Sequence, residues 1–274
     1  MTQKSADSRN VADLRKQQPI QALLLTLSFF PLMTVWTILG IVASPFLFML
    51  WKIVTGWEVD RIIRHLIWIH GRGLAVIVSP FVRIKKEGLD DIPRPCILVV
   101  NHLSFFDGYY MSTLPFHDIT FAVGAWPFKM FWYTIFMRLA RYINVENAGW
   151  AEAVNTCRRA SLKLGCTLFF PEGHRSRTGR LQQFFSGAFR MAVETGIPIV
   201  PLCITGTDIL LPPGNFWLHP TDIHLKALPP IDPADFAGQG GPTRMRNYVR
   251  GIMAKNIKEM RADPFDQDIR TSHI

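Results

Sequence analysis

An imidazole and a carboxylate stand five positions apart in the stretch VVNHLSFFDGYY, residues 99–110. His102 and Asp107 follow a run of branched apolar residues that is typical of a buried strand. If the chain bends where that strand ends, the carboxylate can bind one imidazole nitrogen and leave the other free to accept a proton. The pair would then be a general base for a hydroxyl or an amine. The same spacing also fits a polar turn in which Asp107 caps a helix.

A second polar cluster follows another apolar run, in FPEGHRSRTGR, residues 170–180. Glu172 and Gly173 are typical of a turn. The turn is followed by three cations: Arg175, Arg177 and Arg180. Glycine lets backbone amides approach an anion, and arginine binds phosphate through paired hydrogen bonds. The cluster predicts a site for an anionic group, with a solvated basic loop as the alternative.

The motifs of several other enzyme classes are absent from the sequence. It has no G-x-S-x-G elbow, no Walker-type phosphate loop, no G-x-G-x-x-G after a strand and no H-E-x-x-H. The four cysteines are Cys96, Cys157, Cys166 and Cys203. They form no C-x-x-C pair, and three of the four lie in apolar runs. This pattern predicts buried reduced thiols. We therefore expect neither a bound metal nor a covalent serine or cysteine nucleophile.

The elements that must position both clusters alternate between strands and helices. Strand patterns occupy residues 81–89, 96–101, 166–170, 197–206 and 223–231. Helix patterns occupy residues 105–114, 150–165, 186–196 and 242–261. This alternation predicts an α/β fold with a mainly parallel central sheet flanked by helices. Ligands of such sheets bind at the carboxyl ends of the strands, where both polar clusters fall.

The N-terminal third has a different composition. No charged residue occurs from Gln17 to Trp51, a run longer than the roughly 20 residues that cross the hydrocarbon core of a membrane. Three helix-bending residues interrupt it: Pro31, Gly40 and Pro45. We expect a helical hairpin that dips into the membrane and returns, with one long tilted span as the alternative. Residues 57–81 mix arginine with isoleucine, leucine and tryptophan, which predicts an amphipathic helix at the interface.

The distribution of charge favours a membrane-associated protein. The 30 basic and 21 acidic residues give a net charge of +9, which suits an anionic membrane or an anionic substrate. No nucleic-acid-binding module is recognisable, so no nucleic acid is expected as a partner. Cations flank the apolar run on both sides: Arg15, Lys16, Lys52, Arg61 and Arg64. This placement predicts that both ends lie on the cytoplasmic side. We expect membrane-anchoring helices in residues 1–80 and a catalytic domain in residues 81–274.

Three ordered blocks resemble a known family. NHLSFFD resembles the N-H-x-S-x-x-D block of the glycerolipid acyltransferases, the 1-acylglycerol-3-phosphate acyltransferase family. FPEGHRSR is similar to their F-P-E-G-T-R-S block, with His174 in place of threonine, and VPLCITG resembles their V-P-[VI]-x-x-x-G strand, with Leu202 at the bracketed position. The resemblance covers residues 82–229 and implies the glycerolipid acyltransferase fold for the catalytic domain.

The resemblance implies a membrane-bound O-acyltransferase of phospholipid biosynthesis. It would transfer a fatty acyl chain from acyl-CoA or acyl carrier protein to the hydroxyl of a lysolipid such as 1-acylglycerol-3-phosphate. His102 would deprotonate the hydroxyl and Asp107 would hold the imidazole, without an acyl-enzyme. Acceptor binding would fall to four residues: Glu172, Gly173, Arg175 and Ser176. The thioester is a co-substrate, so no cofactor is expected, and the active domain would face the cytoplasm at a bacterial inner membrane.

Two positions depart from the family pattern. Val145 stands where the family's F-I-[DN]-R block ends in arginine, and Phe185 stands where its F-K-x-G block has lysine. Both missing cations are associated with the acceptor's phosphate, and Arg177, Arg138 and Arg141 are candidates to replace them. Three alternatives therefore stay open: an acyltransferase for a different acceptor, such as an amino-acid or polyene lipid; a CoA-independent transacylase; and a catalytically silent lipid-binding protein.

Overall fold

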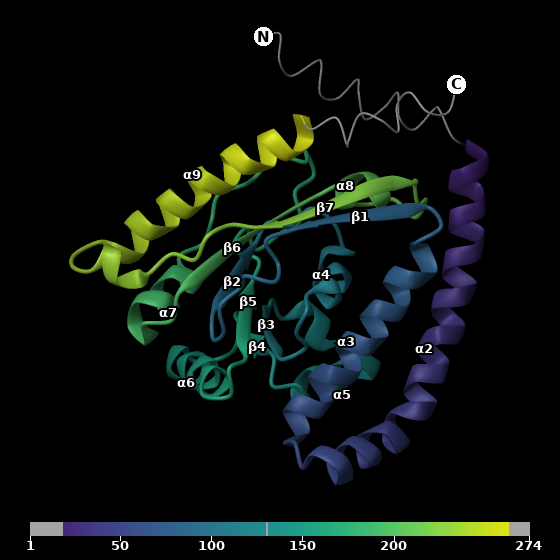
Figure 1. The fold of residues 1–274 in the computed structure, drawn as a ribbon, viewed down its shortest axis with the longest axis horizontal. Helices are drawn as coiled ribbons and strands as arrows, with labels where there is room; N and C mark the ends of the chain where they lie inside the picture. Colours follow the sequence, from purple (N-terminus) through teal and green to yellow (C-terminus); the bar gives the residue numbers. More distant parts are fainter. Residues whose placement is uncertain (1–18, 130, 263–274) are drawn as a thin grey trace.

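The computed structural model describes residues 19–129 and 131–262 and places a seven-stranded sheet between helices (Figure 1). In spatial order the strands are β1 (Val82–Glu87), β7 (Thr221–Ala227), β6 (Ile199–Thr205), β2 (Ile97–Val100), β5 (Cys166–Phe169), β3 (Ile119–Val123) and β4 (Ile143–Asn144). The strands from β6 to β4 are parallel, β7 pairs with β6 antiparallel, and β1 pairs with β7 parallel. The predicted mainly parallel α/β sheet is confirmed.

Helices cover both faces of this sheet. On one face lie α6 (Trp150–Ser161), α7 (Gly187–Thr195) and α9 (Gly241–Ala262). On the other lie α2 (Pro19–Thr55), α3 (Val59–Val78) and the short α4 (Asp107–Tyr110). The remaining helices are α5 (Phe131–Leu139) and α8 (Thr207–Leu210), with 3₁₀ turns at Met111–Thr113, Trp126–Lys129 and Pro233–Phe236.

Strand β2 shows why its sequence is apolar throughout. Leu98 and Val100 belong to the core under α2, α3 and α4, whereas Ile97 and Val99 belong to the core under α6, α7 and α9. All four side chains are fully buried. A strand covered on both faces needs no polar alternation, because neither side meets water.

Four elements were missing from the sequence prediction: β3, β4, α5 and the four-residue α8. β3 has five residues and β4 only two, and such short apolar stretches are indistinguishable from loops by periodicity. The positions of both strands depend on pairing, since β3 lies beside β5 with Ile119 opposite Cys166.

The hairpin predicted within Gln17–Trp51 is wrong, because the described part of this stretch, from Pro19 onward, belongs to a single helix. α2 has 37 residues and runs through Pro31 and Pro45, and Figure 1 shows it bent along its length. Each proline removes one backbone donor, which a helix accommodates by bending. The chain turns back only at Gly56, which has a φ of 66° and leads into α3. The hairpin is therefore formed by α2 and α3 together.

The amphipathic helix predicted in residues 57–81 is confirmed as α3, and a buried ion-pair network fastens it to the catalytic domain. Arg64, only 3 % exposed, donates from Nε to Asp118 at 2.6 Å, just before β3. Its other nitrogens donate to the Ala140 carbonyl at 2.8 Å and to Asp60 at 3.2 Å. Every hydrogen-bonding group of this guanidinium is thus directed at the protein, as burial of a charge requires.

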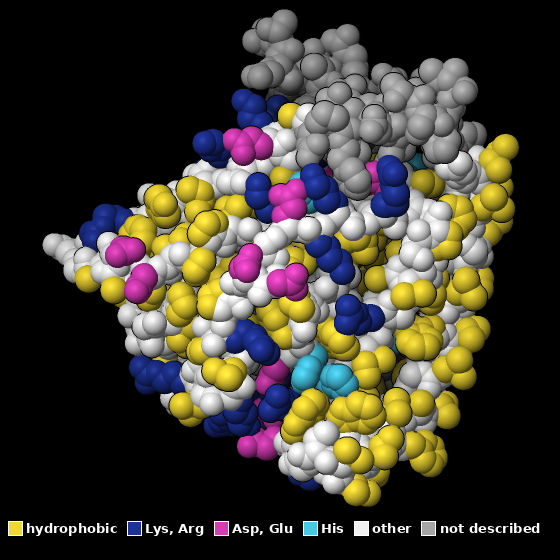
Figure 2. All heavy atoms as spheres, in the orientation of Figure 1, with side chains coloured by type: hydrophobic (Ala, Val, Ile, Leu, Met, Phe, Trp, Pro, Cys, Tyr) yellow, Lys and Arg dark blue, Asp and Glu magenta, His cyan; other side chains and the backbone are white. Residues whose placement is uncertain are grey.

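Both ends of α2 lie against the rest of the chain. Leu25 and Phe29 are buried in the same core as Phe106, and near the other end Trp51 stacks on His65 of α3 with 5.3 Å between ring centroids. Most of the remaining apolar side chains of α2 are exposed, and Figure 2 shows hydrophobic side chains along the edge where α2 lies. Among the described residues, α2 is the helix long and apolar enough to cross a membrane. The flanking Arg15 and Lys16 lie outside the described residues.

Candidate active site

The two polar clusters meet because β2 and β5 are neighbouring parallel strands. Val99 lies opposite Phe169 in the register of the two strands. His102 and Glu172 each follow three residues later, so both lie beyond the carboxyl edge of the sheet. The prediction that both polar clusters lie at the carboxyl ends of neighbouring strands is therefore confirmed.

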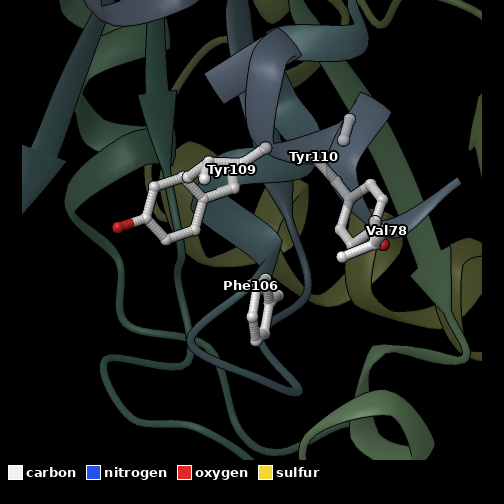
Figure 3. A pocket seen from close by; sticks show the side chains of 6 residues that line it. Val78, Phe106, Tyr109 and Tyr110 are labelled. Atoms are coloured by element: carbon white, nitrogen blue, oxygen red, sulfur yellow. The ribbon is translucent and has the colours of Figure 1, made fainter. Parts of the chain in front are cut away.

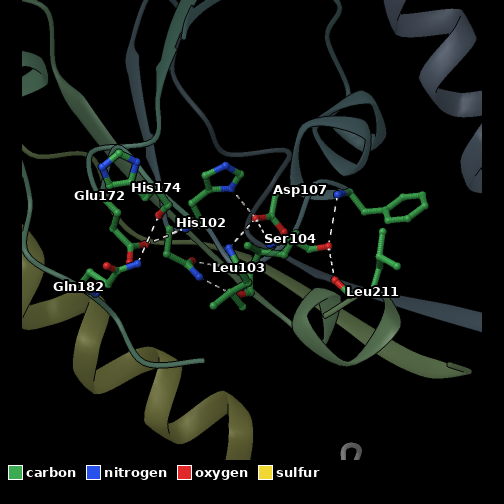
Figure 4. Close-up of polar contacts among 11 residues, drawn as sticks. His102, Leu103, Ser104, Asp107, Glu172, His174, Gln182 and Leu211 are labelled. Atoms are coloured by element: carbon green, nitrogen blue, oxygen red, sulfur yellow. Dashed lines mark hydrogen bonds and ion pairs between the residues drawn. The ribbon is translucent and has the colours of Figure 1, made fainter. Parts of the chain in front are cut away.

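His102 and Asp107 form a hydrogen-bonded pair (Figure 4). The imidazole Nδ1 lies 2.8 Å from Asp107 Oδ2, and the same oxygen accepts hydrogen bonds from the amides of Leu103 at 2.6 Å and Ser104 at 2.8 Å. The 102–107 segment thus wraps around its own carboxylate. Asp107 does not cap α4 with its side chain, so the helix-cap alternative is wrong and the predicted contact between His102 and Asp107 is confirmed. The catalytic role of the pair stays a prediction.

The pair leaves the second imidazole nitrogen available for chemistry. An ionised carboxylate at Nδ1 selects the tautomer with the proton on that nitrogen, and Nε2 then carries the lone pair. No residue that the structure describes bonds Nε2, and the side chain is 21 % exposed. Phe170 stacks on the ring with 4.3 Å between centroids and limits its rotation. His102 can therefore accept a proton from a hydroxyl that enters from solvent or lipid.

Glu172 fixes the backbone around the pair. Its Oε1 accepts the His102 amide at 2.7 Å, and its Oε2 accepts the Gln182 amide at 2.8 Å. The carboxylate is 3 % exposed, and burial raises its pKa although the two amides oppose the shift. Both oxygens are used within the protein, so in this structure Glu172 positions His102. Direct contact with an acceptor stays a prediction.

Gly173 and Ser176 shape the turn that follows. Gly173 has a φ of 70°, and a Cβ there would lie 2.7 Å from the ring of Phe185, so only glycine fits. Its amide donates to the Phe170 carbonyl at 3.1 Å. Ser176 donates its amide to the His102 carbonyl at 2.8 Å and its hydroxyl to the Arg180 carbonyl at 2.7 Å. These polar groups hold the 172–182 loop together, and their contact with an acceptor is a prediction that the structure leaves open.

Two arginines of this loop are free to bind an anion. Arg175 and Arg177 are exposed, and neither forms an ion pair with any residue in the described part of the chain. The opposite holds for Arg141, whose Nε lies 4.0 Å from Asp60. Arg138 and Arg141 precede β4, whereas His102 lies beyond the end of β2, and the two strands run in the same direction. The structure therefore brings Arg175 and Arg177 to the site but not Arg138 or Arg141.

Three further residues support the site although the sequence analysis did not name them: Asn101, Ser104 and Arg250. Asn101 holds the end of β2 to β6 through two hydrogen bonds with Ile204, at 2.9 and 2.8 Å. Ser104 donates its hydroxyl to the Leu211 carbonyl at 2.9 Å. Arg250 of α9 donates to the Gln182 carbonyl at 2.8 Å. Only Asn101 and Ser104 could have been suspected, because both stand inside the N-H-x-S-x-x-D block.

Arg250 is expected to act as a positioning residue. Its guanidinium donates to the Gln182 carbonyl, the Gln182 amide donates to Glu172, and Glu172 accepts the amide of His102. Arg250→Met should lower kcat/KM roughly tenfold, since small misplacements of catalytic groups are costly. Arg250→Lys should restore part of the activity, because lysine can still donate to the carbonyl. Arg246 on the same helix is half-buried, and its side chain bonds the neighbouring Asn247 rather than the 172–182 loop, so it provides the matched control. Steady-state kinetics with melting temperatures would check this, and a lower melting temperature with unchanged kinetics would contradict it.

An apolar pocket borders the catalytic segment. It lies between α3 and α4 and is lined by Leu74, Ala75, Val78, Phe106, Tyr109 and Tyr110 (Figure 3). Phe106 directly precedes Asp107, so the pocket adjoins the His102 pair. The pocket has room for about one water molecule, which is too little for a hydrocarbon chain. In the described ranges no three His, Cys, Asp or Glu side chains are grouped as metal ligands would be.

An imidazole with one open nitrogen, paired with a buried carboxylate and close to two arginines that form no ion pair within the described ranges, suits acyl transfer. Comparison with known proteins agrees. The acyltransferase family model matches residues 83–205, a little under half of the chain. The chain is 30% identical over 236 residues to a 1-acyl-sn-glycerol-3-phosphate acyltransferase of Limnanthes douglasii, covering 83% of this chain and 77% of that one. It therefore belongs to the family of the 1-acylglycerol-3-phosphate acyltransferases.

Two further relatives support the assignment. The 1-acyl-sn-glycerol-3-phosphate acyltransferase of Escherichia coli K12 is 30% identical over 172 residues, which cover 60% of this chain and 67% of the relative. The crystal structure of the 1-acyl-sn-glycerophosphate acyltransferase PlsC from Thermotoga maritima superimposes with a TM-score of 0.72 at 25% identity. It covers 90% of this chain and 99% of that chain. The resemblance inferred from the three sequence blocks and the expected fold are both confirmed.

Proposed function

We propose that the protein is a membrane-associated 1-acylglycerol-3-phosphate O-acyltransferase that uses an acyl thioester, either acyl-CoA or acyl carrier protein. The observation that carries the proposal is the His102–Asp107 pair, whose Nε2 is open at the edge of the sheet where Arg175 and Arg177 are free to bind phosphate. The relatives named above act on the same acceptor according to their names.

The proposed reaction follows from this geometry. His102 Nε2 takes the proton of the lysolipid hydroxyl as its oxygen attacks the thioester carbonyl. The ester C–O bond forms, the C–S bond breaks, and the thiolate leaves and takes the proton from the imidazolium. Asp107 stabilises the imidazolium between the two proton transfers. The thioester supplies the driving force, so the reaction needs no metal or further cofactor.

The membrane assignment rests on α2 and α3. α2 exposes most of its uncharged surface but lies against the protein near both ends, which favours both ends on one side of a membrane. On α3, Arg61 lies over the ring of Trp57 and Arg72 over that of Trp68, at 4.4 and 4.3 Å. Paired tryptophan and arginine suit the lipid headgroup region. We propose the cytoplasmic face of a bacterial inner membrane as the location.

A second candidate acceptor is favoured by two apolar side chains near the site. Phe185 is 65 % exposed beside the Gly173 turn, and Val145 is 52 % exposed just past the end of β4. Neither side chain can neutralise a phosphate. These two positions therefore favour a lysolipid whose head group is less anionic than that of 1-acylglycerol-3-phosphate.

The acceptor can be settled with purified protein, acyl-CoA and an equimolar panel of lysolipids analysed by mass spectrometry. We expect phosphatidate as the main product. Arg175→Gln should raise KM for 1-acylglycerol-3-phosphate by about tenfold or more, the equivalent of one charge-assisted hydrogen bond. Arg159→Gln, at an exposed position of α6, serves as the charge-matched control. If the main product comes from a different lysolipid, and the KM for that lysolipid is unchanged in Arg175→Gln, the second candidate is supported instead.

A further inference from the structure

The 211–219 loop, between α8 and β7, presents two aromatic side chains to the outside. Phe216 is 82 % and Trp217 is 50 % exposed. The loop is not a loose excursion, because the His219 amide donates to the Leu210 carbonyl at 3.0 Å and closes its base. The adjoining Leu218 is fully buried. The closed base and the buried Leu218 fix the loop in a conformation that keeps Phe216 and Trp217 exposed, and exposed apolar side chains that are held in this way indicate a binding surface.

This loop is attached to the first turns of α2. The Leu218 amide donates to the Thr26 hydroxyl at 3.0 Å, and Leu218 shares a core with Leu25 and Phe29. Other residues of the same turns are exposed: Ile20, Leu23, Leu24 and Leu27. The aromatic loop therefore continues the exposed apolar surface of α2.

The loop is also attached to the catalytic segment. The Leu211 carbonyl accepts the Ser104 hydroxyl at 2.9 Å (Figure 4), and the Ser104 amide donates to Asp107. Phe105, between Ser104 and the rest of the segment, is itself 43 % exposed. Two hydrogen bonds, from Ser104 to Leu211 and from Ser104 to Asp107, therefore connect this loop to the carboxylate that bonds His102.

We propose that Phe216 and Trp217 insert into the interfacial region of a phospholipid bilayer and form a second membrane contact beside α2. The proposal rests on the proposed function and names a further membrane-binding element. A bilayer fits better than a protein partner because the surface continues a long uncharged helix and its tip carries phenylalanine and tryptophan, which favour the interface. Insertion there would hold the catalytic edge at the depth of the lipid hydroxyl.

The first test is a fluorescent label at the loop. The native cysteines Cys96, Cys157, Cys166 and Cys203 are buried, so Phe216→Cys can be labelled selectively. Leu162→Cys, 86 % exposed at the end of α6 on the other face of the sheet, provides the matched control. With vesicles of brominated phosphatidylglycerol, we expect quenching at position 216 and none at position 162. An unquenched label at position 216 on protein that floats with the vesicles would overturn the proposal.

The second test separates membrane contact from chemistry. Phe216→Ser/Trp217→Ser should raise the apparent KM for vesicle-borne lysophosphatidate by roughly tenfold or more, because burying one large apolar side chain is worth at least that factor. The rate with monomeric short-chain substrates should be unchanged, and Leu162→Ser should change neither. Unaltered vesicle kinetics in the double variant would overturn the proposal. If the wild type acylates neither acceptor, the proposed function fails, while the quenching result still decides the membrane contact.

Discussion

His102→Ala should lower kcat by about 10²–10⁴, the usual loss when a general base is removed. His102 Nε2 is the one open nitrogen of a ring that Asp107 and Phe170 hold in place. Without it, the lysolipid hydroxyl must lose its proton to water while it attacks. KM should change little, because the imidazole acts on the reacting proton and does not grip the head group.

The control for this prediction is His174→Ala, since that side chain is exposed in the same region. Its backbone carbonyl accepts a bond from Gln182, and its imidazole bonds no residue in the described part of the chain. It should keep activity close to that of the wild type. Initial rates of CoA release, measured under saturating acceptor, give both values. Full activity in His102→Ala would show that His102 is not the general base.

Arg64→Met should lower the free energy of unfolding by about 3–5 kcal/mol, the usual cost of removing one partner from a buried ion pair. The change leaves Asp118 and Asp60 buried, each 5 % exposed, without their main cation. Arg61, at 3.7 Å from Asp118, is too distant to replace the bond at 2.6 Å. The melting temperature should fall by roughly 6–20 °C in a chain of this size.

A double variant identifies the cause. Arg64→Met/Asp118→Asn should lose less stability than the sum of its single changes, because it removes the stranded charge together with its partner. Lys255→Met breaks only an exposed pair with Glu259 on α9 and should be nearly neutral. Thermal unfolding in detergent measures the loss of stability in each variant. If the loss in the double variant equals the sum of the two single losses, Arg64 and Asp118 do not act as a pair.

The meeting of the two polar clusters was predictable because each cluster follows a fully buried, largely apolar strand. CILVV and CTLFF are recognisable as strands, and chemistry follows each of them. Neighbouring parallel strands bring their carboxyl ends together, so His102 and Glu172 had to meet once β2 lay beside β5. The pairing of His102 with Asp107 followed from the bend after the strand.

The parts that escaped prediction depend on contacts between distant residues. Arg250 reaches the Gln182 carbonyl across 68 positions, and its own helix pattern shows only a basic face. Glu172 was expected at the acceptor, but its two amide partners become visible only in three dimensions. Proline in an apolar run predicted a break, yet α2 continues as a bent helix because its neighbours hold it along α3.

The most direct test of acyl transfer to a lysolipid hydroxyl without an acyl-enzyme is one mixing experiment. Purified protein is mixed with isotopically labelled acyl-CoA, first without and then with 1-acylglycerol-3-phosphate, and both protein and lipid are analysed by mass spectrometry. We expect unmodified protein at every time point and labelled phosphatidate only after the acceptor is added. An acyl adduct on the protein before the acceptor is added, or no labelled phosphatidate afterwards, would contradict direct attack assisted by His102.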